Sequence, residues 1–432
     1  MIKSFFRWLI ILVLRWEAKL ILHRYKPKIV AVTGSVGKTS AKDAIALALQ
    51  TASTVRASPK SYNSEIGVPL TILGVANAWH HPFGWLKNIL HGFCLIIFRT
   101  PYPEWLVLEI GADRVGDIQS LGRWLHPDIA VLTSLPLVPA HVEFFPSPEA
   151  LFAEKGVLLK AVKPKGAIVI NADDERVREL VEKLIVGKKL EQRKIIRFGW
   201  SDSADIKISD DQLSLKGLTG KVDYAGHTLP LRLTQLYGRQ QLYAILAGLA
   251  VGVSANYSIL PIIQALETYQ PPPGRGRLIE GIKNTFILDD SYNASPEAMT
   301  AALETLKNFP ATGQRIAVLG DMLELGAYTI DAHREIGKIA AKICELIITV
   351  GVRAKFIADG ATEAGFELSK LLHFDDAREA GQALQPLLLP GDVVLVKGSQ
   401  AGRLERVVEE IMLHPEDKEK LLARQEPEWQ TR

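Results

Sequence analysis

The sequence is poor in cysteine, with only Cys94 and Cys344 among its 432 residues. The two lie far apart and match no metal-ligand or redox spacing, so they fit a reducing compartment and a structural role. An excess of charge of one sign is also missing, since Lys and Arg total 51 against 48 for Asp and Glu. This small surplus is spread along the chain, so we expect a cytoplasmic protein that does not bind nucleic acid.

The N-terminus lacks an apolar run long enough to cross a bilayer. Its longest uninterrupted run covers residues 8 to 14, whereas a transmembrane helix needs about 20. Lys3, Arg7, Arg15 and Lys19 recur at multiples of four, which places basic groups along one stripe of an otherwise apolar helix. Residues 1–27 therefore predict either a helix on the inner face of an anionic membrane or a helix docked on the protein's own body.

Beyond residue 28, strand and helix patterns alternate, which predicts an α/β fold with a largely parallel sheet covered by helices. Residues 199–233 contain short alternating runs that predict antiparallel strands at the edge of this sheet. The segment 269–281 concentrates three prolines and three glycines, which marks a domain boundary. The alternation then restarts. We therefore predict an N-terminal helix over 1–27, a P-loop central domain over 28–270 and a Rossmann-like doubly wound domain over 271–432.

Residues 74–104 combine aromatic and aliphatic side chains with a few basic ones. They predict buried packing or, alternatively, a second element that faces a membrane or a partner.

The stretch "VAVTGSVGKTS", residues 30–40, predicts a phosphate-binding loop between a strand and a helix. Val32 replaces the first glycine of the strict Walker A spacing, but the functional half remains. Backbone N–H groups at Gly34 and Gly37 can turn toward phosphate oxygens, Lys38 supplies a positive charge and Thr39 a hydroxyl for Mg²⁺. We assign ATP binding to this loop, with Gly34, Ser35, Gly37, Lys38, Thr39 and Ser40 as its residues.

A phosphate loop that works with a metal needs acidic or imidazole ligands nearby. Glu109 ends a predicted strand, and His141, Glu143, Glu154 and Lys155 follow in a loop and a helix start. A carboxylate and an imidazole suit Mg²⁺ as members of a mixed shell with water and phosphate oxygens. Taken singly, each would more often be a solvated surface residue; together, after a phosphate loop, they indicate a metal site.

Several motifs resemble, in order, those of the Mur ligase family over about residues 28–410. They read "TGSVGKTS", "YNSEIGVPLTIL", "LEIGADRVGDI", "AHVEFF", "INADD", "LDDSYNASPEAM", "VLGDMLELG" and "VLVKGSQAGRLERVV". The resemblance implies an ATP-dependent amide-bond ligase that activates a carboxylate as an acyl phosphate before an amine attacks it. The implied substrates are a muramoyl peptide precursor and D-Ala-D-Ala, used by a monomer.

The resemblance also implies roles for single residues. Lys38, His141 and Lys155 would be catalytic, and two Mg²⁺ ions would be held by Thr39, Glu109, His141 and Lys155, with Lys155 carbamylated. Asn63, Lys397 and Ser399 would contact the substrate, and Arg275, Asp290 and Asn293 would close over ATP, with Arg277 competing for the arginine role. Without the resemblance, most of these would be ordinary turn or cap residues.

The sequence departs from the family at two places. The branch that it resembles holds a uridine nucleotide in a separate N-terminal domain, and we expect that domain to be absent here. Gln240, Gln241 and Ala244 stand where the family has its usual adenine contacts. Alternative functions are a related ligase that acts on a lipid-linked or other carboxylate acceptor at the membrane, a nucleotide-gated binding protein, or a kinase.

Overall fold

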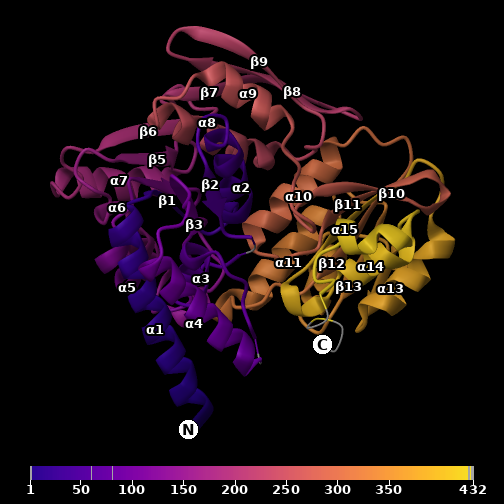
Figure 1. Cartoon of the computed structure of the whole chain (residues 1–432). Coiled ribbons are helices and arrows are strands. Elements are labelled where there is room, and N and C mark those ends of the chain that lie inside the picture. Colours follow the sequence, from indigo (N-terminus) through magenta and orange to yellow (C-terminus); the bar gives the residue numbers. More distant parts are fainter. Residues whose placement is uncertain (1, 60, 80, 427–428, 430–432) are drawn as a thin grey trace.

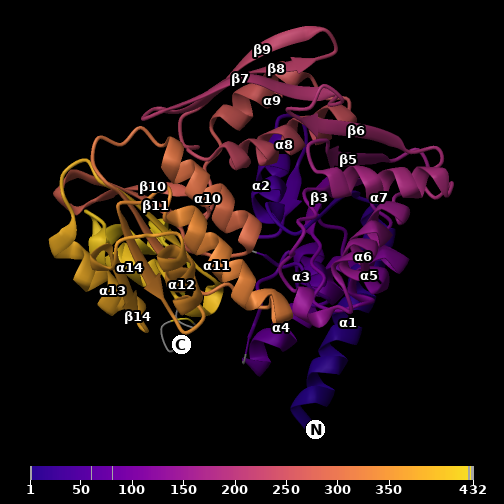
Figure 2. The same cartoon turned by 180° about the vertical axis from the view of Figure 1, so that it is seen from behind.

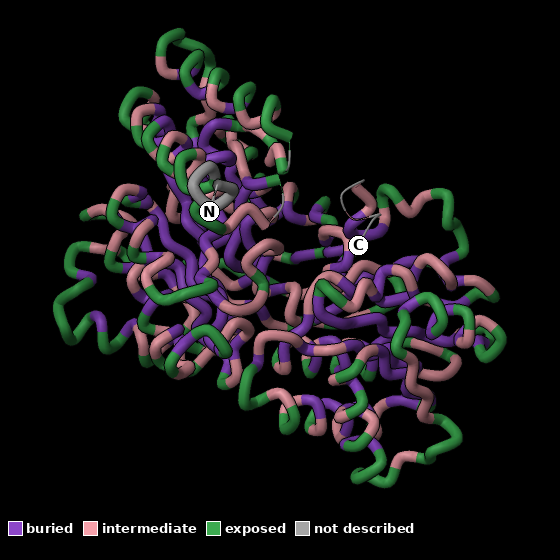
Figure 3. Tube along the Cα trace, turned by 90° about the horizontal axis from the view of Figure 1, so that it is seen from below, coloured by how far each residue is buried: buried purple, intermediate pink, exposed green. Residues whose placement is uncertain are grey.

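Two sheets, each covered by helices, lie side by side in the computed structural model (Figures 1 and 2), which describes residues 2–59, 61–79, 81–426 and 429. Of residues 2–6 it describes the backbone only, so the side chain of Lys3 lies outside the described part. The predicted α/β fold, with a P-loop sheet followed by a doubly wound sheet, is confirmed. We call each sheet with its covering helices a unit. Buried segments run through the middle of both units (Figure 3).

The first sheet has nine strands in the order β2-β3-β1-β4-β5-β6-β7-β8-β9. Neighbours are parallel from β2 to β7, whereas β7, β8 and β9 pair antiparallel, as residues 199–233 predict. The strands are β1 (Lys28–Thr33), β2 (Val55–Ala57), β3 (Trp105–Glu109), β4 (Ile129–Leu132), β5 (Ala167–Asn171), β6 (Lys194–Gly199), β7 (Ile206–Ser214), β8 (Gly217–Tyr224) and β9 (His227–Leu233).

Helices cover both faces of this sheet because its central strands are apolar on both sides. In β1, Val30 and Val32 join one core while Ile29 and Ala31 join the other. The first face carries α2 (Lys38–Leu49), α8 (Leu242–Ser254) and α9 (Ile259–Glu267). The second carries α1 (Ile2–Tyr25), α3 (Gly67–Leu73), α5 (Asp117–Leu125), α6 (Pro148–Lys160) and α7 (Glu175–Val186), and α4 (Pro82–Ile97) packs on α1 and α3.

The second sheet has six strands in the order β10-β11-β15-β12-β13-β14, all parallel except β10. They are β10 (Arg277–Gly281), β11 (Thr285–Asp290), β12 (Arg315–Gly320), β13 (Leu346–Val350), β14 (Leu371–Phe374) and β15 (Val393–Lys397). One face carries α10 (Pro296–Asn308), α11 (Thr329–Ala340) and α12 (Lys355–Glu363); the other carries α13 (Ala377–Leu384) and α14 (Glu405–Ile411), and α15 (Lys418–Leu421) follows.

The segment 269–281 is only partly irregular. Its prolines, at 271–273, cannot donate backbone hydrogen bonds. From Arg277 onward, however, the chain pairs antiparallel with β11 as β10.

Helix α1 docks on the protein and also keeps an apolar side in solvent. Leu14, Ala18 and Ile21 are completely buried against the first sheet, whereas Leu12 and Trp16 are 45% and 50% exposed. In the part of the chain that the structure describes, none of the helices has the length and apolarity to cross a membrane.

Candidate functional site

A cavity of about 2210 Å³ lies between the two units, where the loop after β1 faces the start of α10. Its wall includes most of the residues predicted for ATP, metal and substrate. From that set it is lined by Ser35, Gly37, Lys38, Thr39, Ser40, Asn63, Glu109, His141, Arg275, Asp290, Asn293 and Lys397. Gly34, Lys155 and Ser399 are not among its described lining residues.

The loop between β1 and α2 has the shape of an anion cradle. Gly34 has φ of 141°, and a Cβ there would lie 2.0 Å from Thr133 Oγ1, so only glycine fits. Gly37, with φ of 80°, precedes α2 without a side-chain cap. The first N–H groups of α2 are therefore free to meet an anion. The buried Ser35 hydroxyl, which has no hydrogen-bond partner among the described residues, is a further donor for it.

Two lysine amines meet at the carbonyl of Gly34. Lys38 Nζ donates to Gly34 O at 3.0 Å, and Lys155 Nζ, from α6, donates to the same oxygen at 2.9 Å. Burial lowers the pKa of Lys38, and burial together with the nearby Lys38 charge sets the pKa of Lys155 well below its usual value. Both shifts favour the neutral amine, and the shift of Lys155 does so more strongly.

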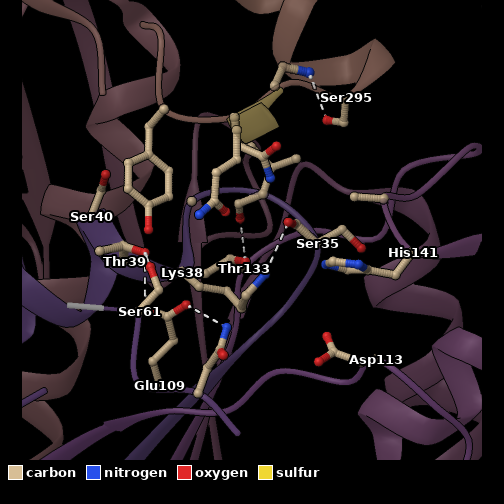
Figure 4. A pocket seen from close by; sticks show the side chains of 18 of the residues that line it. Ser35, Lys38, Thr39, Ser40, Ser61, Glu109, Asp113, Thr133, His141 and Ser295 are labelled. Carbon is tan, nitrogen blue, oxygen red and sulfur yellow. Dashed lines mark hydrogen bonds between the residues drawn. The ribbon is translucent and has the colours of Figure 1, made fainter. Parts of the chain in front are cut away.

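Side chains whose oxygen atoms could bind a metal ion gather at the end of β3 beside this loop (Figure 4). Thr39 Oγ1 donates to Glu109 Oε2 at 2.9 Å and lies 3.2 Å from Ser61 Oγ. Asn63 Nδ2 donates to Glu109 Oε1 at 3.2 Å. The Thr39 hydroxyl at the start of α2 and the buried Glu109 carboxylate at the end of β3 fit one Mg²⁺ that also binds phosphate oxygens and water. No cluster of three His, Cys, Asp or Glu side chains suited to a metal occurs among the described residues.

His141 turns toward the second unit. Its backbone is left-handed, with φ of 69°, and its Nδ1 forms an ion pair with Glu324 in the loop after β12. The hydrogen bond from His141 lowers the pKa of the Glu324 carboxyl. The structure therefore brings His141 to the cavity, but bound to a carboxylate of the other sheet.

The second unit contributes an ion pair and a stacked arginine. Lys397 Nζ, 2% exposed, donates to Asp290 Oδ2 at 2.6 Å and to Asn293 O at 3.0 Å. The Arg275 guanidinium lies 4.1 Å from the centre of the Tyr292 ring. A cationic and aromatic surface of this kind can accept a nucleotide.

Two candidates lie away from the cavity lining, namely Arg277, the alternative to Arg275, and Ser399, predicted to bind substrate. Arg277 donates to Lys420 O at 3.2 Å and lies outside the described lining of the large cavity. Ser399 Oγ accepts from Leu323 N at 2.9 Å, so it joins the loops after β15 and β12.

The glutamines at the start of α8 tie that helix to the other unit. Gln241 Nε2 donates to Arg275 O at 2.9 Å, and its Oε1 accepts from Gly238 N at 3.0 Å. Gln240 Oε1 accepts from Thr305 Oγ1 at 3.1 Å. Both side chains line the cavity and also connect the two units.

Sequence reasoning missed several polar residues of the cavity, namely Ser61, Asp113, Ser134 and Glu297, and also Glu324, which contacts His141. Asp113 could have been found, because it follows Glu109 closely beyond the strand end. Glu297 carries no such signal: burial, together with the nearby Asp174 carboxylate, raises the pKa of its carboxyl to about 7. Its neighbours Asp174 and Ser134 belong to the first unit, so only the packing of the two units brings them together.

The sequence matches known protein domains and enzymes. The Mur ligase middle domain matches residues 94–252, and the Mur ligase glutamate ligase domain matches residues 274–400. The UDP-N-acetylmuramoyl-tripeptide–D-alanyl-D-alanine ligase of Mycobacterium tuberculosis (strain H37Rv) is 30% identical over 89% of this chain and 72% of that protein. The enzyme of the same name from Bacillus subtilis (strain 168) is 28% identical, over 92% and 79%.

A solved structure has a similar fold. The MurF ligase of Thermotoga maritima, in complex with ADP, superposes with a TM-score of 0.76 at 28% identity and covers 93% of this chain and 83% of that one. The fold, the phosphate loop and the sequence relatives therefore agree, and the chain belongs to the Mur ligase family.

Proposed function

We propose that this protein is an ATP-dependent ligase that joins D-Ala-D-Ala to a muramoyl tripeptide in peptidoglycan precursor synthesis. The observation that carries this function is the contact of Thr39 with Glu109 behind a glycine-rich anion cradle, in a cavity that also holds Arg275 and Lys397 of the second unit. The relatives named above support the substrates, because their names state this reaction. The ADP-bound relative supports ATP as the nucleotide.

The chemistry has two stages. A carboxylate oxygen of the acceptor attacks the γ-phosphorus of ATP, and the bond from that phosphorus to the β–γ bridging oxygen breaks, which releases ADP. The D-Ala-D-Ala amine then attacks the acyl carbon, and the tetrahedral intermediate expels phosphate while the nitrogen loses a proton. Lys38 and the N–H groups of α2 would stabilise the negative charge on the transferred phosphoryl group.

Metal ligation is part of the proposal. Thr39 and Glu109 would hold one Mg²⁺, and His141 with a carbamylated Lys155 would hold a second, after His141 leaves Glu324. Bound Mg²⁺ would neutralise charge on the phosphate oxygens. Carbamylation needs a neutral amine, and the lowered pKa of Lys155 supplies one. The hydrogen bond of the unmodified Lys155 Nζ to Gly34 O supports the proposal, because Gly34 belongs to the phosphate cradle.

The predicted domain limits also remain proposals. A hinge near residue 270 would let the unit of residues 28–270 and the unit of residues 271–432 close on ATP, with Asp290, Asn293 and Arg275 meeting the nucleotide and Asn63, Lys397 and Ser399 the substrate. Closure would exclude water from the acyl phosphate. We propose that the protein acts as a monomer at the inner face of the membrane.

Product analysis tests the function. The full chain is incubated with ATP, Mg²⁺, D-Ala-D-Ala and a UDP-linked muramoyl tripeptide, and the products are identified by mass spectrometry. We expect ADP, phosphate and the amide-linked pentapeptide in equal amounts. Phosphorylated peptide that persists would indicate a kinase instead, and nucleotide binding without any turnover would indicate a nucleotide-gated binding protein.

A further inference from the structure

Helices α1 and α4 expose a continuous apolar surface beside the cavity. On α4 the exposed apolar residues follow a helical stripe with steps of three and four, and Phe83 is 84% and Ile97 65% exposed. We call the following set the α1–α4 face: Trp8, Leu12 and Trp16 of α1, with Phe83, Leu90, Phe93, Ile97 and the adjacent Phe98. Leu86 lies on the same stripe but also lines the cavity. Large exposed apolar patches mark interaction surfaces.

The two helices form one unit. The Trp16 and Phe93 rings lie 5.9 Å apart, and Tyr25 Oη donates to Leu95 O at 2.9 Å. Gly92 permits this approach, because a Cβ there would lie 2.5 Å from Glu17 Oε2. Figures 1 and 2 show α1 and α4 side by side, with the N-terminal end of α1 projecting from the body. The apolar stripes are therefore held on one rigid support.

The exposed charges on the two segments that carry this face all have the same sign. Residues 7–28 and 81–100 carry no exposed carboxylate. Their exposed charged side chains are all basic, namely Arg7, Lys19, Arg24, Lys26, Lys28, Lys87 and Arg99. The one carboxylate in these segments, Glu17, is buried, and burial raises its pKa to about 7. An apolar surface rich in Trp and Phe and bordered by basic groups matches the interface of an anionic bilayer. The same basic border disfavours a second copy of the chain, because two such faces would repel each other.

The inner side of these helices closes one end of the cavity. Leu9, Ile10 and Val13 of α1, together with Trp85 and Ile89 of α4, line the same cavity as Lys38. A membrane bound to the outer side would therefore lie next to an apolar entrance to the site.

We propose that the α1–α4 face docks on an anionic membrane and that the acceptor is a muramoyl peptide carried on a lipid, which enters the cavity between these helices. The docking stands on the surface alone, whereas the identity of the acceptor rests on the proposed function. Docking of this face would bring lipid-linked substrates to the ligase. It would also explain why a cavity that binds phosphates has an apolar wall.

Vesicle co-sedimentation of the full chain tests the docking. Vesicles of phosphatidylcholine are compared with vesicles that also contain phosphatidylglycerol, and we expect about tenfold or tighter binding to the anionic ones. The triple variant Phe83→Ser, Leu90→Ser, Ile97→Ser should lose about tenfold or more in binding. The double variant Lys87→Glu, Arg99→Glu should lose the preference for anionic lipid.

A matched control removes the same amount of exposed apolar surface elsewhere, through Val186→Ser, Val352→Ser and Leu368→Ser. It should bind vesicles like the unmodified chain. Absence of vesicle binding, or equal loss in the control, would overturn the docking. So would sedimentation analysis showing a dimer that the α4 triple variant disperses, because a second copy would then cover the face.

Turnover tests the acceptor. On vesicles that carry a lipid-linked muramoyl tripeptide, the α4 triple variant should release ADP at least about fivefold more slowly than the control, while both act equally on a UDP-linked tripeptide. Use of the UDP-linked acceptor alone would overturn the lipid-linked assignment. No turnover on either acceptor, with vesicle binding intact, would instead count against the ligase function.

Discussion

The imidazole of His141 forms an ion pair with the Glu324 carboxylate, which joins the loop before α6 to the loop after β12. The contact links the two units directly across the cavity. It also engages His141, which the proposed second Mg²⁺ would need as a ligand.

Replacing Glu324 with Gln should weaken this link. Because both side chains are partly exposed, the free energy of unfolding at neutral pH should fall by less than about 1 kcal/mol. The pKa of Glu324 is lowered in the folded state, so its contribution is present above the ordinary value of 4.5 and is lost as the pH falls further. Denaturant unfolding at several pH values measures this. A stability difference that persists at strongly acid pH would contradict the pairing.

Replacing Lys38 with Ala should lower the rate of ADP release by about a thousandfold, since a preorganised charge at the phosphoryl group is lost. The fold should persist, because burial of this amine already lowers its pKa and its removal relieves that desolvation. Thermal unfolding checks the fold, and Lys183→Ala on an exposed turn of α7 is the control. Activity like that of the unmodified chain would remove the phosphate-loop assignment.

Replacing Glu109 with Gln should raise the Mg²⁺ concentration at half-maximal rate by about tenfold or more. The neutral amide keeps the size of the side chain but removes the charge that the cation needs. Glu104→Gln is a matched control, because Glu104 lies next to the opposite end of β3 and accepts from Ser53 Oγ at 2.7 Å. An unchanged Mg²⁺ dependence in Glu109→Gln would place the metal elsewhere.

Replacing Lys155 with Met should abolish turnover without loss of stability at neutral pH. The pKa of Lys155 lies well below its ordinary value of 10.5 because of burial, so folding favours the neutral amine, whereas the unfolded chain holds the amine protonated below 10.5. This cost shrinks as the pH rises toward 10.5, and the unmodified chain should gain stability relative to Met over that range. Incorporation of labelled bicarbonate, present in the unmodified chain and absent in Lys155→Met, tests carbamylation.

Replacing Glu17 with Gln should stabilise the protein above neutral pH. Burial raises the pKa of this carboxyl from 4.5 to about 7, so its stabilising effect is complete below 4.5 and is lost as the pH rises through 7. Between these values the unmodified chain should lose up to about 1.4 kcal/mol per pH unit relative to Glu17→Gln. Unfolding by denaturant at pH near 5 and near 8 measures the difference. A flat pH dependence would mean that the Glu17 carboxyl is hydrated.

The central elements of both sheets were predictable from the sequence, because buried parallel strands are continuous apolar runs and their helices start at recognisable turns. "KIVAVTG" and "DVVLVKGS" are examples, and both are strands in the structure. The short strand β2 and the edge strand β10 escaped prediction. Pairing with neighbours, rather than their own pattern, makes them strands.

The phosphate loop and the family could be predicted from the sequence alone, since local spacing carries both. Only the tertiary structure decided that His141 meets Glu324, that Lys38 and Lys155 share one carbonyl, and that α1 buries one side while leaving another in solvent. These outcomes depend on residues distant in the chain. A single helix period gives the side chains that share a face, but packing between elements decides which face is buried.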